Sequence, residues 1–231
     1  MLRVIGDVHG CVDYCRVDAY DAQVRRERRS YLNIINEAEY SVQLGDVGFS
    51  DAYSLLKGWM VDPAKHKFIQ GNHDDYDNPP PHILGDFGIA THGGITFGFI
   101  RGEKSVDQQY RKARQAAGYP QTWWEQEEFT VAQADACIEF FSKVPKLDIM
   151  LAHGCPHKLF SCGILTNEYK LEPSYQSRLL TVISETVKIK SWIFGHHHHR
   201  WRATVEGTNY ICLQELTYLD ISDDGSIGQT I

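Results

Sequence analysis

The segment "LRVIGDVHG" at residues 2–10 joins a short apolar run to polar side chains that follow it directly. The apolar run is typical of a buried β-strand, and Asp7 and His9 come just after it. Four further segments repeat this arrangement: "YSVQLGDVG" (40–48) ends near Asp46, "HKFIQGNHDD" (66–75) at Asn72, His73 and Asp74, "LDIMLAHGCP" (147–156) at His153, and "SWIFGHHHH" (191–199) at His196 to His199. Five strands that end in polar residues indicate one shared site.

Helical patterns lie between these strands, and we expect helices over residues 12–38, 51–60, 131–143 and 174–187. Thr130 and Gln133 are typical of a capping box before the third helix. Alternating strands and helices predict an α/β fold, in which ligands bind beyond the carboxyl ends of the strands. The five polar clusters should therefore meet at one sheet edge.

The end of the chain has a different pattern. "RWRATVEG", "NYICLQEL" and "YLDISDDGSI" predict short strands with antiparallel pairing, at a second sheet or at a sheet edge. Residues 101–130 are polar and aromatic without strand periodicity, and we interpret them as an insertion near the mouth of the site. A surface helix and loop without a role is the other interpretation of that segment.

Composition sets broad limits. A chain of 231 residues with 42% hydrophobic residues is expected to fold as one domain over residues 1–231. The net charge of -7 argues against strong nonspecific binding to nucleic acid. The sequence has no secretory signal pattern and no apolar run near the roughly 18 residues of a membrane span. We therefore expect a cytoplasmic protein with reduced cysteines, and composition leaves the oligomeric state open.

The run of four histidines lies between apolar strand residues and further folded sequence, which argues against a purification tag. The residues expected to converge offer oxygen and imidazole donors without thiolate: Asp7, His9, Asp46, Asn72, His153, His196 and His198. Such donors favour divalent manganese, iron or zinc over calcium, and nickel or cobalt are compatible with them. One aspartate can bridge two ions about 3.5–4 Å apart.

These segments, in their order along the chain, resemble the five-part signature of the calcineurin-like metallophosphoesterases, small bacterial and phage-type members in particular. The matching residues lie between positions 1 and 198: Asp7-Val8-His9, Gly45-Asp46, Gly71-Asn72-His73-Asp74, His153 and Gly195-His196-His197-His198. The resemblance implies a four-layer αββα sandwich of two mixed β-sheets flanked by helices.

The same resemblance implies two divalent metal ions, manganese before the others. It implies one ion held by Asp7, His9, Asp46 and His198, and a second held by Asp46, Asn72, His153 and His196. If the histidine run is extended, His197 and His199 point away from the metals, because neighbouring side chains of a strand alternate.

The family pattern leaves His73 off the metals and beside the substrate. An imidazolium is a suitable general acid for a leaving alkoxide, and Asp74 is expected to hold and charge that ring. The implied function is a dinuclear metal-dependent phosphoesterase that hydrolyses small phosphomonoesters or phosphodiesters by attack of a metal-activated hydroxide.

The substrate is less well defined by the sequence. "GDVGFSD" lacks the Asp-Arg-Gly of protein serine/threonine phosphatases, so a phosphoprotein substrate is disfavoured. Asn72 and Arg101 are expected substrate contacts, although Arg101 is equally interpreted as a surface residue. Trp123 and Trp124 are compatible with a nucleotide-like substrate or with plain packing. The alternatives are a nuclease or cyclic-nucleotide phosphodiesterase, and a non-catalytic scaffold of the same fold, which the complete ligand set and His73 disfavour.

Overall fold

The computed structural model describes residues 1–13, 29–162 and 173–231, and contains two mixed β-sheets. The four-stranded sheet has the order β10-β1-β2-β3, with β1 at Leu2–Ile5, β2 at Ser41–Gln43, β3 at His66–Phe68 and β10 at Tyr218–Ile221. The six-stranded sheet has the order β4-β5-β6-β7-β9-β8, with β4 at Phe87–His92, β5 at Ile95–Ile100, β6 at Lys146–Ala152, β7 at Lys188–Phe194, β8 at Trp201–Val205 and β9 at Thr208–Cys212.

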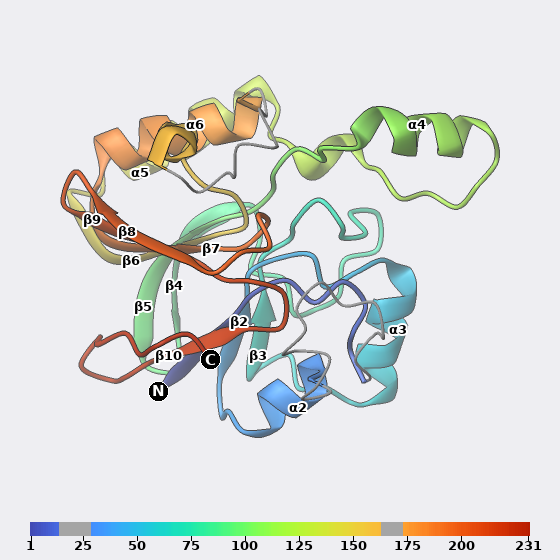
Figure 1. The fold of residues 1–231 in the computed structure, drawn as a ribbon, viewed down its shortest axis with the longest axis horizontal. Helices are drawn as coiled ribbons and strands as arrows, with labels where there is room; N and C mark the ends of the chain where they lie inside the picture. Colours follow the sequence, from blue (N-terminus) through green and yellow to red (C-terminus); the bar gives the residue numbers. More distant parts are fainter. Residues whose placement is uncertain (14–28, 163–172) are drawn as a thin grey trace.

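Helices cover the outer faces of the two sheets (Figure 1). α2 at Tyr31–Asn36 and α3 at Ser50–Gly58 cover the four-stranded sheet, and α5 at Val131–Ser142 and α6 at Tyr175–Thr186 cover the six-stranded sheet. α4 at Gln108–Ala116 projects away from both sheets, and short 3-10 turns lie at Glu125–Glu127 (η1) and His157–Cys162 (η2). The expectation of one helix over 12–38 is wrong, because Ser30 has an extended backbone and caps the start of α2 with its side chain, so the helix begins only at Tyr31. Residues 14–28 lie outside the described part. Thr130 and Gln133 form the expected capping box at the start of α5.

Alternation along the strands explains why each sheet has two buried faces. Val4 packs between the two sheets, whereas its neighbour Ile5 packs toward α2 and α3. In β6, Leu151 likewise faces the other sheet, and Met150 faces α5 and α6. Successive side chains of a strand point to opposite faces, so a strand segment covered on both sides is a nearly continuous apolar run, as in the fully buried second half of β6. The result is the four-layer αββα sandwich that the family resemblance of the sequence implies.

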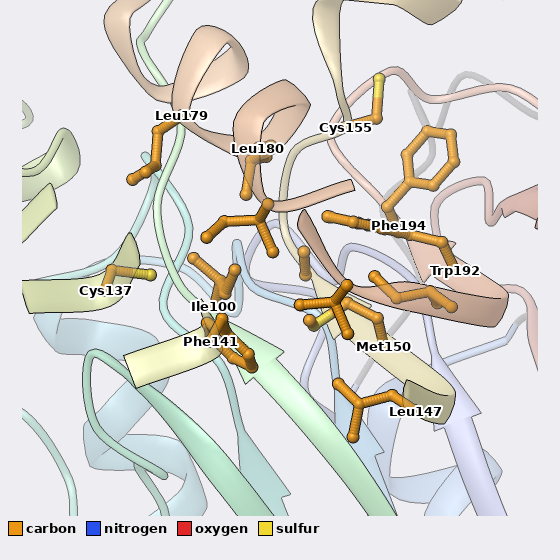
Figure 2. Packing of buried hydrophobic residues seen from close by; sticks show 14 of the residues in the cluster. Ile100, Cys137, Phe141, Leu147, Met150, Cys155, Leu179, Leu180, Trp192 and Phe194 are labelled. Atoms are coloured by element: carbon orange, nitrogen blue, oxygen red, sulfur yellow. The ribbon is translucent and has the colours of Figure 1, made fainter. Parts of the chain in front are cut away.

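The outer core of the six-stranded sheet is closely packed (Figure 2). Phe141 of α5 and Leu180 of α6 lie in the same cluster as Met150 and Trp192, and all four side chains are fully buried. Leu179, Leu180, Ile183 and Val187 belong to this cluster, as the apolar face of the predicted helix requires. This packing fixes β6 and β7, the two strands whose ends carry His153 and the histidine run.

The antiparallel pairing expected for the end of the chain is confirmed for β8 with β9 and for β10 with β1, and β8 and β10 are the edge strands of their sheets; β9 in addition pairs parallel with β7. The expectation of one shared sheet edge needs correction. The five strands that end in polar residues belong to two sheets: β1, β2 and β3 to one, β6 and β7 to the other. A strand pattern does not show which strands share a sheet. No helix within the described ranges is long and apolar enough to cross a membrane.

Candidate metal centre

The carboxyl ends of strands from both sheets bring the expected ligands together. Asp7 and His9 follow β1 and Asp46 follows β2 in the four-stranded sheet, while His153 follows β6 in the six-stranded sheet. Their side chains fall into two groups of donors: Asp7, His9, Asp46 and His198 in the first, and Asp46, His153 and His196 in the second. Within each group the ligand atoms all lie within 4.8 Å of one another.

The first group has the spacing of a single coordination shell. His198 Nε2 lies 2.8 Å from His9 Nε2 and 3.1 Å from Asp7 Oδ2. His9 Nε2 lies 3.8 Å from Asp46 Oδ2. Two donors at right angles, each about 2.1 Å from one ion, are about 3.0 Å apart. The group therefore fits one divalent ion.

The second group gains an oxygen donor from Asn72. Its Oδ1 lies 3.0 Å from His153 Nε2 and 2.9 Å from His196 Nδ1. The two imidazole nitrogens are 3.2 Å apart, and Asp46 Oδ1 is 3.3 Å from His153 Nε2. Asp46 thus turns Oδ2 toward the first group and Oδ1 toward the second, as a bridging carboxylate does.

Hydrogen bonds outside the two groups orient the donors. His153 Nδ1 lies 2.9 Å from the carbonyl oxygen of Leu44, which directs Nε2 toward Asp46. Such a bond fixes the tautomer of a metal-binding imidazole. The Asp7 carboxylate accepts hydrogen bonds from the His196 backbone amide at 3.1 and 3.2 Å. These contacts hold the loops of the two sheets against each other.

Glycines allow the ligand loops to approach this closely. A Cβ at Gly71 would collide with Asp46 and His153, and one at Gly195 would collide with Asp7. Four of the candidate donors have unusual backbones: φ is 48° at His9, 60° at Asp46, 64° at His196 and 53° at His198. These values lie in the left-handed region, which non-glycine residues seldom adopt.

The amide of Asn72 is oriented by two residues that the sequence analysis did not single out. Its Nδ2 donates to Ser105 Oγ at 3.2 Å, and that hydroxyl donates to Glu127 Oε2 at 2.6 Å. An ionised carboxylate only accepts, so the Ser105 hydroxyl must accept from Asn72. Asn72 Oδ1 is then left facing the imidazoles. Ser105 and Glu127 lie in the polar 101–130 segment, where composition alone gave no signal for them.

Burial and mutual charge shift the pKa values of the site. Burial alone would lower the pKa of His9, but the hydrogen bond with Asp7 and the charge of Asp46 raise it to about 9. Burial acts to raise the pKa of Asp7, yet His198 and His9 hold it well below its ordinary value. Burial and the neighbouring His153 keep the pKa of His196 well below its usual range. The Asp7 carboxylate is accordingly ionised and available to cations.

Asp74 has a different role from the one expected. Its Oδ2 accepts hydrogen bonds from the backbone amides of Asp46 at 2.8 Å and Gly71 at 2.7 Å, and its Oδ1 accepts from Gly48 at 3.2 Å. Burial and the charge of Asp46 raise its pKa to about 7. The expectation that Asp74 holds the His73 ring is therefore wrong, because this carboxylate ties together the loops after β2 and β3.

The His73 ring lies beside the donor groups, next to Arg111. Nη2 of Arg111 is 2.5 Å from Nε2 and 3.2 Å from Nδ1 of His73. The ring packs against Phe49 at 5.9 Å and meets the ring of His9 edge-on at 4.8 Å. Burial, and after it the charges of His9 and Arg111, lower the pKa of His73 to about 4 against the opposite effect of Asp46. Sequence reasoning did not identify Arg111.

Arg101 lies away from the donor groups. It is 4% exposed, its Nε donates to Asp86 Oδ1 at 2.5 Å, and its guanidinium lies over the rings of Tyr76 and Phe129. Its Nη1 donates to the carbonyl oxygen of Gln126. This geometry contradicts the expected phosphate contact, because the side chain is used to anchor the start of the 101–130 segment.

The histidine run forms a turn and not an extended strand. The expectation that its side chains alternate because the segment is extended is therefore wrong. His197 nevertheless points away from the donors. Its Nε2 lies 3.3 Å from Cys155 Sγ, and its ring lies 5.9 Å from Phe160 and 6.1 Å from Phe194. Burial lowers its pKa to about 3, so the ring packs as a neutral group. His196 and His198, on either side of His197, have left-handed backbones, and these turn the His197 side chain away from the donors.

Comparison with known proteins identifies the architecture. No protein-family profile matches the sequence, and no curated protein matches it significantly. A dimetal phosphatase from Danio rerio superposes with a TM-score of 0.54 at 16% identity, over 94% of this chain and 91% of that one. A protein of Thermus thermophilus superposes with a TM-score of 0.53 at 11% identity, over 100% of this chain and 97% of that one. At these identities the likeness establishes the fold.

Proposed function

From the calcineurin-like metallophosphoesterase fold of this chain, we propose that the protein is a metal-dependent phosphoesterase acting on small phosphoesters. The observation that carries this proposal is the position of Asp46, whose two oxygens face different donor groups. A shared carboxylate is the arrangement that holds two ions about 3.5–4 Å apart for attack on phosphorus.

The donors would divide between two ions. Asp7, His9, Asp46 and His198 would hold one, and Asp46, Asn72, His153 and His196 the other. Two divalent ions there would polarise the phosphoryl oxygens and supply hydroxide near neutral pH. Imidazole and carboxylate donors suit manganese, with iron, zinc, nickel and cobalt compatible.

His73 is the residue proposed to assist the leaving group. Its backbone amide donates to Asp46 Oδ1 at 2.7 Å, which fixes the residue next to the donor groups. With a pKa of about 4 in the ligand-free protein, the ring is neutral near pH 7 and carries one N–H. We propose that a phosphoryl anion bound beside His73 lets the ring take up a proton from solvent, and that the resulting imidazolium gives this proton to the oxygen that leaves phosphorus. Asn72 is the second proposed substrate contact.

The test is metal analysis combined with hydrolysis of p-nitrophenyl phosphate and bis-p-nitrophenyl phosphate. We expect two divalent ions per chain, loss of activity on chelation, and recovery with manganese before the other metals. Asp46→Asn should lose both ions, whereas Asp148→Asn, on an exposed position of β6, should keep them. Full activity after complete removal of metal would contradict the proposal.

The same assays separate the alternatives. A nuclease or cyclic-nucleotide phosphodiesterase would cleave the diester faster than the monoester. A non-catalytic scaffold would bind metal and hydrolyse neither compound.

A further inference from the structure

Among the residues that the structure describes, Arg111 on α4 of the 101–130 segment brings its guanidinium against the His73 ring from outside the two donor groups, with Nη2 2.5 Å from Nε2. We propose that Arg111 binds the phosphoryl group and gives the site a preference for phosphomonoester dianions over phosphodiesters. This inference rests on the proposed function, which leaves the choice between the two ester classes open.

Arg111 is held in one orientation by its own segment. Its Nε donates to Asp107 Oδ1 at 2.6 Å, and its Nη1 donates to the carbonyl oxygen of Thr122 at 3.0 Å. Only 8% of its side chain is exposed. Because hydrogen bonds fix Nε and Nη1 of the planar guanidinium, Nη2 already points at His73. Binding of a ligand by Nη2 would therefore cost little additional side-chain entropy.

The segment that carries Arg111 is attached to the site at several points. Ser105 accepts a hydrogen bond from Asn72, and Trp124 Nε1 donates to Asp77 Oδ2 at 2.9 Å. Phe49 packs against both Trp124 and His73, with ring centroids 5.8 and 5.9 Å away. The position of Arg111 is thus a product of tertiary packing and not of one flexible side chain.

The neutral His73 ring is a weaker hydrogen-bond acceptor for Arg111 Nη2 than an anionic oxygen would be. In the ligand-free protein the neutral ring can accept from Nη2. An anionic oxygen accepts a hydrogen bond from guanidinium more strongly than a neutral group does. A phosphoryl oxygen that reaches His73 therefore comes within reach of Nη2, and both side chains can bind it.

The number of free phosphoryl oxygens gives the specificity. A phosphomonoester has three unesterified oxygens and about two negative charges near pH 7, whereas a diester has two such oxygens and one charge. Two ions can each take one oxygen, so only the monoester keeps a third oxygen for Arg111. Two divalent ions held by Asp7 and Asp46 would give the centre a net charge of about +2, from four positive and two negative charges, and Arg111 adds one more.

The kinetic test compares Arg111→Ala and Arg111→Lys with Arg114→Ala, a change at an exposed arginine of the same helix. For the manganese-loaded protein, Arg111→Ala should lower kcat/KM for p-nitrophenyl phosphate by about 100-fold, mainly through KM, as expected for one charge-assisted contact. The loss for bis-p-nitrophenyl phosphate should stay within about threefold. Arg111→Lys should lie between, and Arg114→Ala should match the parent protein. Equal losses on both esters would overturn the inference.

Calorimetry with inorganic phosphate and with dimethyl phosphate tests the same contact without catalysis. Arg111→Ala should weaken phosphate binding at least tenfold and leave dimethyl phosphate binding within threefold. If phosphate binding follows this pattern but neither ester is hydrolysed, the proposed function fails and the role of Arg111 stands. If esters are hydrolysed and Arg111→Ala and Arg111→Lys both bind phosphate like the parent protein, the inference about Arg111 alone is wrong.

Discussion

His197 and His198 are adjacent in the chain but lie in different surroundings. His198 faces His9 and Asp7, whereas His197 lies against Cys155, Phe160 and Phe194. We expect His198→Ala to lose one ion per chain and most activity. His197→Ala should keep both ions but lower the free energy of unfolding by about 1–2 kcal/mol, because it removes a packed ring. Elemental analysis and denaturant unfolding measure the two effects, and loss of metal from His197→Ala would contradict the assignment.

The loss of kcat on substitution of His73 should depend on the leaving group of the substrate. An alkoxide is a poor leaving group without a proton, whereas p-nitrophenolate leaves readily without one. His73→Asn should therefore lower kcat by about 10²–10⁴ for an alkyl phosphate and by much less for p-nitrophenyl phosphate. Metal content serves as the control, since the substitution leaves every donor in place. A loss of the same size on both substrates would assign His73 to binding instead.

Single residues also show where sequence reasoning stops. The strand-end motifs placed Asp7, Asp46 and His153 correctly beside one another, because their positions follow from strands that end at the same level. The roles given to Asp74 and Arg101 depend on where a side chain turns, and both turn toward the backbone or a local partner. The sequence did not identify Arg111, because its contact with His73 depends on how α4 packs against the rest of the protein.

Among the elements, the short turn η1 has a specific effect on the second donor group. Glu127 accepts from Ser105, and Ser105 accepts from Asn72, so the amide oxygen faces the imidazoles. In Glu127→Gln the side-chain amide can donate to the Ser105 hydroxyl. That hydroxyl can then donate to Asn72, which turns the Asn72 amide nitrogen and not its oxygen toward the imidazoles. We expect the affinity for one manganese ion to fall by about 10- to 100-fold while the other is retained.

Glu125→Gln, an exposed change in the same turn, is the matched control and should bind both ions normally. Titration of the metal-free protein with manganese gives the two affinities. An equal fall in both affinities would show that Glu127 acts through general stability.

Helices and strands with strong patterns were predicted well. The capping box of α5 and the apolar face of α6 depend on local spacing, which the sequence displays directly. The 101–130 segment has no such periodicity, so the sequence left open whether it is an insertion near the mouth of the site or a surface helix and loop without a role. Its order comes from buried contacts such as Ser105 with Glu127 and Arg101 with Asp86.

At the scale of the molecule, the donor groups connect the two sheets. Asp7 and Asp46 come from the four-stranded sheet, and His153 and His196 come from the six-stranded one. Metal at 100 times its dissociation constant should stabilise the folded protein by about 2.7 kcal/mol per site. For a chain of this length that raises Tm by about 5–10 °C for each occupied site. Thermal unfolding with manganese and with chelator measures the difference, and Asp46→Asn should show none.

The division into two sheets could not be derived from the strand pattern alone. Strands covered on both faces are nearly continuous apolar runs, whether they lie in one doubly covered sheet or in two stacked sheets. The resemblance to the metallophosphoesterases supplied the second sheet, and the inter-sheet cluster around Val42, Leu151 and Ile193 accounts for it.

The left-handed backbones of the site have a consequence for directed evolution. Seven non-glycine residues in the described ranges have positive φ, and four of them are proposed ligands: His9, Asp46, His196 and His198. Each such conformation costs on the order of 1–3 kcal/mol, and glycine adopts it freely. A library screened only for heat resistance in the presence of chelator should therefore enrich glycine or asparagine at these positions. The same library screened with manganese present should keep the histidines and the aspartate, and sequencing both pools would show whether backbone strain and metal binding compete at these four codons.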